Sequence, residues 1–180
     1  MHQQDRESRE NFLATLDWLM AVIGRYQSSL HFALVHNTFG DRNELGEAYG
    51  AREAVRQLAT LTESLKGGLR KTDLICRNGK DIWVLVPFNS ATERLCDKVQ
   101  DIFQSIEHEG LHVFNRRTAV FDLSAMGAEV VAQFKALDAY GLFDYLLRNK
   151  ESLATCQCTS MSPCTRRAAA AGEQRPGTAA

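Results

Sequence analysis

The sequence has no excess of positive charge, no long apolar run and no internal repeat. Its 180 residues contain 21 Lys and Arg against 22 Asp and Glu, a net charge of -1. A protein that follows a nucleic-acid backbone carries a basic surface, so we expect no long nucleic acid among its partners. No stretch approaches the roughly 20 apolar residues that cross a bilayer, and the polar first ten residues lack a signal peptide's apolar segment. We therefore expect a cytoplasmic protein that inserts nothing into a membrane.

The five cysteines form no even, regular framework of the kind that crosslinks small secreted domains. Cys76 and Cys96 lie inside patterned segments, whereas Cys156, Cys158 and Cys164 crowd into the C-terminal region. Reduced thiols are the simplest interpretation. The C-terminal cysteines have no fourth ligand at a suitable spacing, so we expect no metal there and no cofactor elsewhere.

The spacing of apolar residues predicts helices at residues 8–26, 51–65, 91–106 and 127–147. Short apolar or alternating runs predict strands at residues 30–35, 73–77 and 81–86, and either a pair of strands or one bent strand at residues 111–123. Glycine in the turn at residues 79–80 makes the second and third of these strands a hairpin. The polar, glycine-containing segment 36–50 predicts a loop at the end of the first strand. This order indicates an α/β (α+β) fold with a mixed, mainly antiparallel central sheet flanked by helices.

The chain is long enough for one compact domain and short for two. We place that domain at residues 8–150, after a flexible N-terminus at residues 1–7. Residues 151–180 are low in large apolar side chains and contain an alanine run and two prolines. Such a composition buries little surface and predicts a disordered tail.

The most informative segment is residues 69–87, LRKTDLICRNGKDIWVLVP. Arg70 and Asp73 stand three apart, Arg77 follows, and a glycine turn leads into an apolar strand that ends at Pro87. This pattern resembles the signature of the GGDEF family, the bacterial diguanylate cyclases, in which an RxxD motif precedes an arginine, the GGDEF turn and such a strand. An RxxD motif alone is common by chance, but the combination at matched spacing is more specific. The resemblance extends from about residue 8 to residue 150 and implies a nucleotidyl-cyclase-like fold.

The resemblance also assigns positions to catalysis, and two of them have changed outside the signature turn. His36 stands where the family places its metal-binding aspartate, and imidazole suits a hard, oxygen-seeking cation poorly. Ala51 occupies the place of an aspartate that reads guanine in the family. Both changes predict a loss of catalysis.

In the signature turn, Gly79 and Asp81 match the family, whereas Lys80, Ile82 and Trp83 replace the second glycine and the last two letters. The Cβ of Lys80 resists a positive φ and keeps the backbone from approaching a phosphate. We interpret Trp83 as a core residue of an apolar strand. The resemblance therefore implies a degenerate domain with no bound metal and no diguanylate cyclase activity.

In the family, RxxD is an inhibitory site that binds cyclic di-GMP. A guanidinium such as Arg70 can donate two hydrogen bonds to guanine O6 and N7, and a carboxylate such as Asp73 can accept from N1 and N2. Lys71 and Arg77 would add charge for the phosphodiesters, and Lys98 lies near the position of a further basic residue of the family site. The alternative is an ordinary surface ion pair between Arg70 and Asp73 that binds nothing.

Two hypotheses follow. The first is a catalytically inactive GGDEF-like receptor that binds cyclic di-GMP and signals to a partner protein, as degenerate relatives do in bacterial exopolysaccharide and biofilm systems. The second is a scaffold that dimerises without nucleotide, through the old active-site face or through the apolar stripe between Phe12 and Ile23. A residual diguanylate cyclase is a distant third.

Overall fold

The computed structural model describes residues 3–26, 31–40, 50–87, 92–108, 115–126, 128–134, 137–159 and 162–166. The helices are α1 (Gln3–Tyr26), α3 (Ala51–Gly68), α4 (Thr92–His108), α5 (Ala128–Phe134), α6 (Ala139–Arg148) and α7 (Lys150–Leu153). The strands are β1 (Phe32–Thr38), β2 (Leu74–Asn78), β3 (Asp81–Pro87), β4 (Arg117–Asp122), β5 (Cys156–Thr159) and β6 (Ser162–Arg166). None of the described helices is both long enough and apolar enough to cross a bilayer.

The strands form one sheet with the order β2-β3-β1-β4-β5-β6. Each neighbouring pair of described strands is antiparallel. The predicted α+β class is confirmed, and the mainly antiparallel sheet has no parallel pair among these strands. The predicted hairpin is present as β2 and β3.

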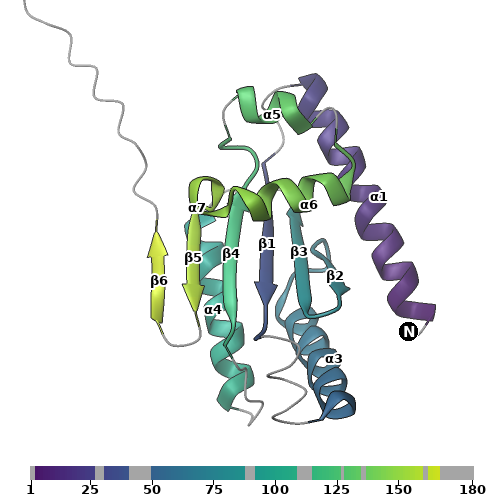
Figure 1. Ribbon diagram of the computed structural model, residues 1–180, viewed down its shortest axis with the longest axis vertical. Coiled ribbons are helices and arrows are strands. Elements are labelled where there is room, and N and C mark those ends of the chain that lie inside the picture. Colours follow the sequence, from purple (N-terminus) through teal and green to yellow (C-terminus); the bar gives the residue numbers. More distant parts are fainter. Residues whose placement is uncertain are drawn as a thin grey trace, which may run out of the picture.

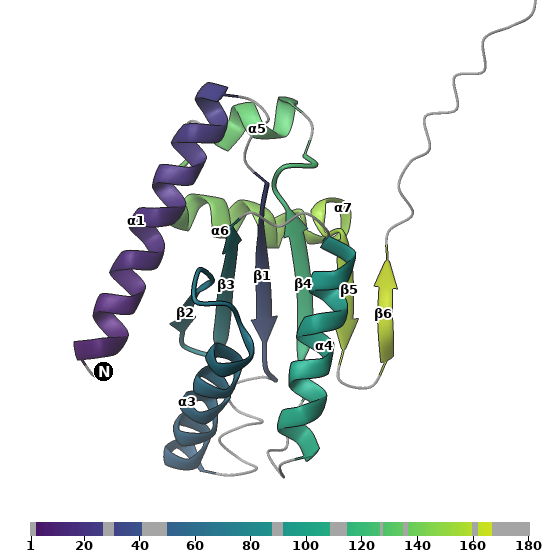
Figure 2. The same ribbon diagram turned by 180° about the vertical axis from the view of Figure 1, so that it is seen from behind.

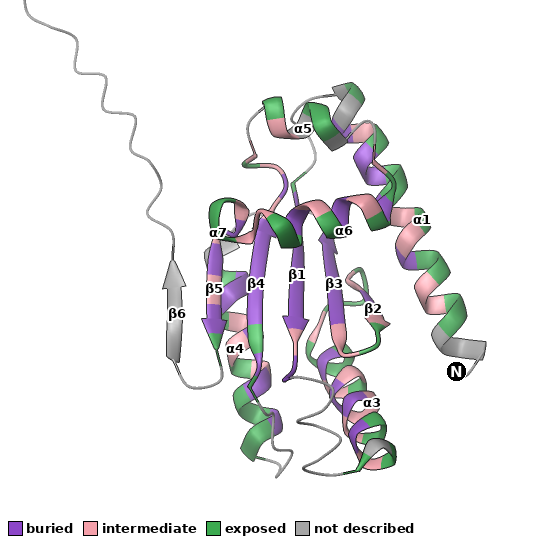
Figure 3. Ribbon diagram, in the orientation of Figure 1, coloured by how far each residue is buried: buried purple, intermediate pink, exposed green. Residues whose placement is uncertain are grey.

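Helices cover both faces of the sheet (Figures 1 and 2). Along β1, Ala33 and Val35 point into a core shared with α3 and α4, whereas Phe32 and Leu34 point into a core shared with α1 and α6. This alternation is the two-residue period of a strand. Burial on both faces explains why the sequence of β1 is almost continuously apolar, and Figure 3 shows the central strands as the most buried part of the chain.

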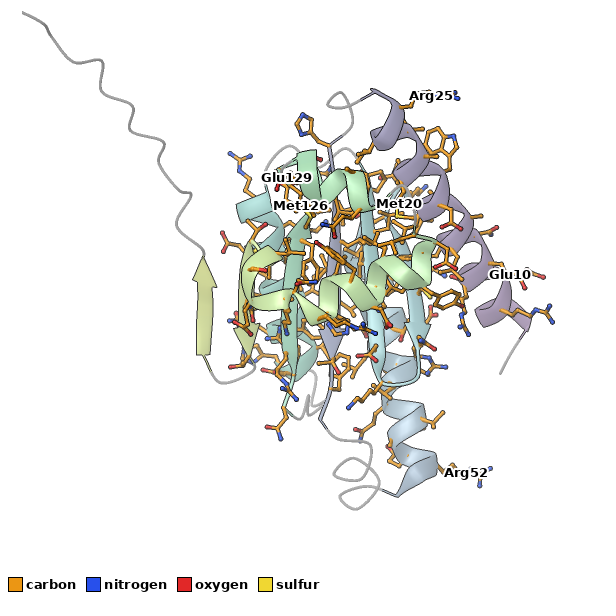
Figure 4. All side chains as sticks on the ribbon, turned by 45° about the horizontal axis from the view of Figure 1, so that its top comes forward. Glu10, Met20, Arg25, Arg52, Met126 and Glu129 are labelled. Carbon is orange, nitrogen blue, oxygen red and sulfur yellow. The ribbon has the colours of Figure 1, made fainter. Side chains whose placement is uncertain are left out.

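Helix α1 packs its apolar stripe against the sheet of its own chain. The buried residues of the stripe are Phe12, Leu16, Leu19, Met20 and Ile23. Ser8 Oγ donates a hydrogen bond to the carbonyl oxygen of Ile75, at a distance of 3.1 Å, on the edge strand β2. Figure 4 shows Met20 pointing inward and Glu10 and Arg25 pointing outward. The stripe between Phe12 and Ile23 is therefore unavailable to a partner helix.

Two boundary predictions are wrong. Helix α1 begins at Gln3, so residues 3–7 are helical and not a flexible N-terminus. The single helix predicted at residues 127–147 is two helices, α5 and α6. The Asp138 side chain accepts a hydrogen bond from the backbone N–H of Gly141, at 2.8 Å, and thereby caps a new helix within the predicted one.

The predicted disordered tail at residues 151–180 is also wrong for its first part. Strand β5 pairs with β4, and Ala154, Cys156 and Cys158 are buried. The composition argument counted large apolar side chains, but small residues fill the space beneath this part of the sheet, where cysteine behaves as a small hydrophobe. Cys76 and Cys96 are free, buried thiols. Residues 167–180 lie outside the described residues.

Removing residues 151–180 should destabilise the domain, because it uncovers the edge of β4 and deletes three buried side chains. We expect Tm to fall by at least about 5 °C, which for a domain of this size corresponds to about 2 kcal/mol. Thermal unfolding followed by circular dichroism measures the change. The matched control removes only residues 167–180 and should keep the Tm of the full chain. Equal Tm values for both truncations would contradict the role assigned to β5.

Candidate functional site

A two-residue turn, Gly79-Lys80, closes the hairpin between β2 and β3, where Asn78 and Asp81 pair. Gly79 has a φ of 65°, whereas Lys80 keeps a negative φ. A positive φ at the first central position alone is the φ pattern of a type II′ hairpin turn. The turn therefore retains the glycine that its geometry requires, and it presents a lysine side chain at the position of the second glycine.

His36 and Asp81 meet on the face of the sheet that α6 covers. The register pairs His36 with Trp83 and Thr38 with Asp81, which makes His36 and Asp81 diagonal neighbours on the same face. His36 Nε2 lies 2.9 Å from Asp81 Oδ1. The His36 side chain is 4% exposed and that of Asp81 is 30% exposed. The imidazole of His36 is thus in direct hydrogen-bond contact with the carboxylate of Asp81.

This contact changes the acidity of Asp81. Partial burial raises its pKa, while the hydrogen bond and charge of His36 lower it, with smaller contributions from Thr38 and Lys80. The net effect places the pKa of Asp81 below its usual value of 3.8. Asp81 is therefore ionised at neutral pH and is held against the imidazole.

Trp83 and Ile82 are core residues, as predicted for Trp83. Trp83 is 2% exposed and stacks on Phe143 of α6 with ring centroids 4.2 Å apart. The His36 ring lies 4.4 Å from the Trp83 ring. Ile82 is fully buried on the opposite face, against α3 and α4. Neither position can present a polar group to a ligand.

The described residues around this turn and Ala51 also bear on metal binding. No group of three or more His, Cys, Asp or Glu able to hold a metal is found in the described part of the chain. Ala51 is the first residue of α3 and follows Gly50, whose φ is 77°. A methyl group has no hydrogen-bond acceptor for a guanine edge.

The RxxD segment forms a tight turn between α3 and β2. The backbone N–H of Asp73 donates to the carbonyl oxygen of Arg70 at 3.0 Å, and the backbone N–H of Arg70 donates to Asp73 Oδ2 at 2.9 Å. Asp73 therefore closes the turn through the backbone of Arg70. The Arg70 guanidinium is exposed, and no ion pair between it and Asp73 is found.

The end of α3 that leads into this turn packs against α4, the helix that carries Lys98. This contact is tight, since a Cβ at Gly68 would lie 2.8 Å from Ile102 Cδ1. Lys98 stands one helical turn before Ile102 and thus on the same side of α4. Lys71 is exposed on the turn itself, and Lys98 is half-buried. The structure thus places Arg70, Lys71 and Asp73 on one turn, beside the helix that carries Lys98.

Arg77 lies further away than the other predicted residues. It stands four residues after Asp73, a separation of about 13 Å along an extended strand, and pairs across the hairpin with Ile82. Arg77 and Asp73 share the face of the sheet that α3 and α4 cover, because their separation is even. The structure therefore does not bring Arg77 into the RxxD turn.

Sequence reasoning missed two basic residues near the end of β1. Thr38 pairs with Asp81 on one side and with Arg117 on the other, so Arg117 and Asp81 lie in one row, about 10 Å apart between Cα atoms. Burial and then the charge of Arg117 lower the pKa of Lys150, at the start of α7. Alternation along β4 could have identified Arg117, but the position of Lys150 depends on the packing of α7. Two cations thus lie near one another on this face of the sheet.

No family model matches the chain, and no curated protein matches it. Solved structures do. The GGDEF domain of DgcB from Caulobacter crescentus, in complex with c-di-GMP, has a TM-score of 0.56 at 10% identity and covers 79% of this chain and 84% of its own. The fold is that of a GGDEF domain.

Two further GGDEF structures support this assignment. The active GGEEF domain of a diguanylate cyclase from Vibrio cholerae has a TM-score of 0.56 at 14% identity and covers 78% of this chain and 90% of its own. The diguanylate cyclase SiaD from Pseudomonas aeruginosa, in complex with its activator SiaC, has a TM-score of 0.54 at 16% identity. The match covers 78% of this chain and 55% of the SiaD chain. At these identities the likeness establishes the GGDEF fold and leaves activity to the residues of the site.

The His36–Asp81 contact should make stability depend on pH. Because the folded-state pKa of Asp81 is lowered, its contribution is fully present above the usual carboxyl pKa of 3.8 and is lost as the pH falls through the lower folded-state value. Asp81→Ala should therefore lower the free energy of unfolding by about 1 kcal/mol at pH 7 and by much less near pH 3.

Urea denaturation at the two pH values measures the difference. Asp101→Asn, which changes an exposed carboxylate on α4, is the matched control and should have little effect at either pH. A loss for Asp81→Ala that is equally large at acidic and neutral pH would contradict the assigned interaction.

Proposed function

We propose that this protein is a catalytically inactive GGDEF domain that binds cyclic di-GMP at the turn Arg70–Asp73 and signals to a partner protein. One observation carries the proposal. In the turn, Arg70 is exposed and its backbone N–H donates to Asp73 Oδ2, whereas His36 Nε2 contacts Asp81 Oδ1 directly at the position that the resemblance gives to the metal site.

The RxxD turn supports recognition of guanine. Asp73 Oδ2 accepts from the backbone of Arg70, and Asp73 Oδ1 lies 3.5 Å from Thr72 Oγ1. A carboxylate has about four acceptor sites, so Asp73 keeps capacity for guanine N1–H and N2–H. The Arg70 guanidinium supplies the complementary donors for guanine O6 and N7. Lys71 and Lys98 supply positive charge for the phosphodiesters.

The residues around the end of β1 support the proposed loss of catalysis. Transfer of a nucleotidyl group needs a divalent cation bound by oxygen ligands and close to phosphate. At this position, imidazole and carboxylate are in direct hydrogen-bond contact, Lys80 adds positive charge next to Asp81, and Arg117 and Lys150 lie near one another on the same face of the sheet. This arrangement favours an anion over a cation.

We assign the output of this domain to a protein partner. A structurally similar cyclase, SiaD, forms a complex with its activator SiaC. In this proposal, binding of cyclic di-GMP at the turn between α3 and β2 changes the surface that the partner contacts.

Titration calorimetry with cyclic di-GMP tests the binding site. We expect micromolar or tighter binding by the unaltered protein and at least a tenfold loss in Arg70→Ala, since each strong bidentate contact is worth about 1–3 kcal/mol. Arg56→Ala, an exposed arginine earlier on α3, should bind as the unaltered protein does. Absence of binding by the unaltered protein would overturn the proposal.

Asp73→Asn separates the structural role of Asp73 from its role in recognition. The amide oxygen can still accept from the backbone N–H of Arg70 and keep the turn closed, but the amide cannot accept from both guanine N–H groups. We expect an unchanged Tm together with a cyclic di-GMP affinity at least fivefold weaker. An unchanged affinity would place the ligand away from Asp73.

Catalysis is tested by incubation with GTP and Mg²⁺ followed by chromatography. We expect no cyclic di-GMP, because Asp81 Oδ1 is in direct contact with His36, which leaves this carboxylate less able to hold a catalytic cation. Formation of product by the purified protein, lost in Asp81→Ala, would show that the site is active.

A dimeric scaffold that needs no nucleotide is the second candidate, and it now rests on a different face of α1. Trp18 is 60% exposed, and Ala14 and Ala21 are exposed at heptad-like spacing on either side of it. Sedimentation velocity distinguishes the candidates. A dimer that Trp18→Ala dissociates and that ignores cyclic di-GMP supports the scaffold, whereas association only with ligand supports the receptor.

A further inference from the structure

The outward face of α1 carries a regular stripe of exposed residues. Its members follow one another at alternating spacings of four and three residues: Glu7, Asn11, Ala14, Trp18, Ala21 and Arg25. All of them are exposed, and Trp18 is 60% exposed. Alternation of three and four residues is the heptad pattern by which one helix packs along another. The residues that α1 buries against its own sheet occupy other positions, so the stripe is a second face of the same helix.

The stripe faces away from the rest of the molecule. Helix α1 lies along the outer edge of the molecule in both views (Figures 1 and 2), and Arg25 points outward (Figure 4). Asp17, which precedes Trp18, is turned toward α6, where its Oδ1 accepts a hydrogen bond from the backbone N–H of Ala139 at 2.8 Å. From Glu7 to Arg25 the stripe is about 27 Å long, because a helix rises 1.5 Å per residue.

The stripe is complementary to a reversed copy of itself. Its spacing is symmetric about a point midway between Ala14 and Trp18, so a second α1 running in the opposite direction presents the same pattern. In that arrangement the large Trp18 of each copy lies opposite the small Ala14 of the other. At the two ends, the acidic Glu7 of each copy lies opposite the basic Arg25 of the other. Size and charge thus match at the same register.

A parallel pair of helices would lack this match. It would place Glu7 against the partner's Glu7 and Arg25 against the partner's Arg25, and like charges in contact are unfavourable. The stripe therefore favours the antiparallel orientation. Glu7 also interacts within its own chain. A carboxylate has about four acceptor sites, so Glu7 can accept from the partner's Arg25 in addition.

We propose that this protein forms a two-fold symmetric dimer in which α1 packs antiparallel against α1 of a second copy. Trp18 packs on the partner's Ala14, and ion pairs between Glu7 and the partner's Arg25 fix the register. Such an interface is isologous, because the same surface serves both copies. The inference rests on the second candidate of the proposed function, the dimer that needs no nucleotide, and gives it a defined interface. It does not depend on the turn Arg70–Asp73.

Sedimentation equilibrium without nucleotide tests the dimer. A contact made by one pair of helices is small for a specific interface, so we expect a Kd of about 10–100 μM for the unaltered protein. Trp18→Ala should raise this Kd at least about tenfold, since a central tryptophan commonly dominates an interface. A monomer at every concentration up to about 500 μM, or a Kd that Trp18→Ala leaves unchanged, would overturn the proposal.

Charge reversal tests the orientation of the helices. Glu7→Arg and Arg25→Glu should each raise the Kd by about fivefold, because each places like charges at both ends of the interface. The double variant Glu7→Arg/Arg25→Glu restores both ion pairs in the opposite sense and should return the Kd to that of the unaltered protein. Glu63→Arg reverses an exposed charge on α3; it is the matched control and should leave the Kd unchanged.

Single reversals without effect would overturn the antiparallel arrangement, since a parallel pair only exchanges one pair of like charges for another. A double variant no tighter than the single variants would overturn it too. If Trp18→Ala fails to fold, the charge variants still decide. Calorimetry with cyclic di-GMP should give the same affinity for Trp18→Ala and for the unaltered protein, so failure of the dimer and failure of the nucleotide site can be recognised separately.

Discussion

The hydrogen bond between His36 Nε2 and Asp81 Oδ1 joins the end of β1 to the start of β3, and the interpretation of the site depends on it. In a sheet of this topology these two positions come together whatever residues occupy them, because the register between β1 and β3 fixes them as diagonal neighbours. Two carboxylates there would repel one another unless a cation lay between them. An imidazole and a carboxylate attract one another directly, so this pair stabilises the fold without a metal.

The His36 side chain also takes part in the packing of the core. The His36 ring lies against Trp83, and Trp83 stacks on Phe143, which continues the aromatic contacts from the strand end to α6. The position that the family signature gives to an acidic residue is occupied by buried Ile82. Ile82 and Trp83 thus belong to the packed core on the two faces of the sheet. The turn at Arg70–Asp73 lies at the opposite end of β2 and remains polar and exposed.

Much of this architecture could be predicted from the sequence. The hairpin, the strand β1 and the amphipathic helices follow from periodicity and from the glycine at position 79, because a local signal decides each of them. The strand β5 could not be predicted in this way, since Cys156 and Cys158 are small and their burial depends on the edge that β4 offers. The split between α5 and α6 depended on one capping residue, Asp138.

The candidate site was predictable in part for the same reason. The residues of the RxxD turn are adjacent in sequence, and their pattern indicated a common turn. The direct contact between His36 and Asp81 and the row that includes Arg117 join residues from different strands. Their contacts follow from register and side-chain packing, which the sequence pattern alone does not specify.

The central claim is that ligand recognition has been retained at the RxxD turn and lost at the old catalytic turn. Amide chemical shifts during titration with cyclic di-GMP test this most directly, because both turns are observed in one experiment. We predict saturable shifts at residues 70–73 and near Lys98, with little change at residues 79–81. Shifts centred on residues 79–81 and His36, or none at any residue, would contradict the account.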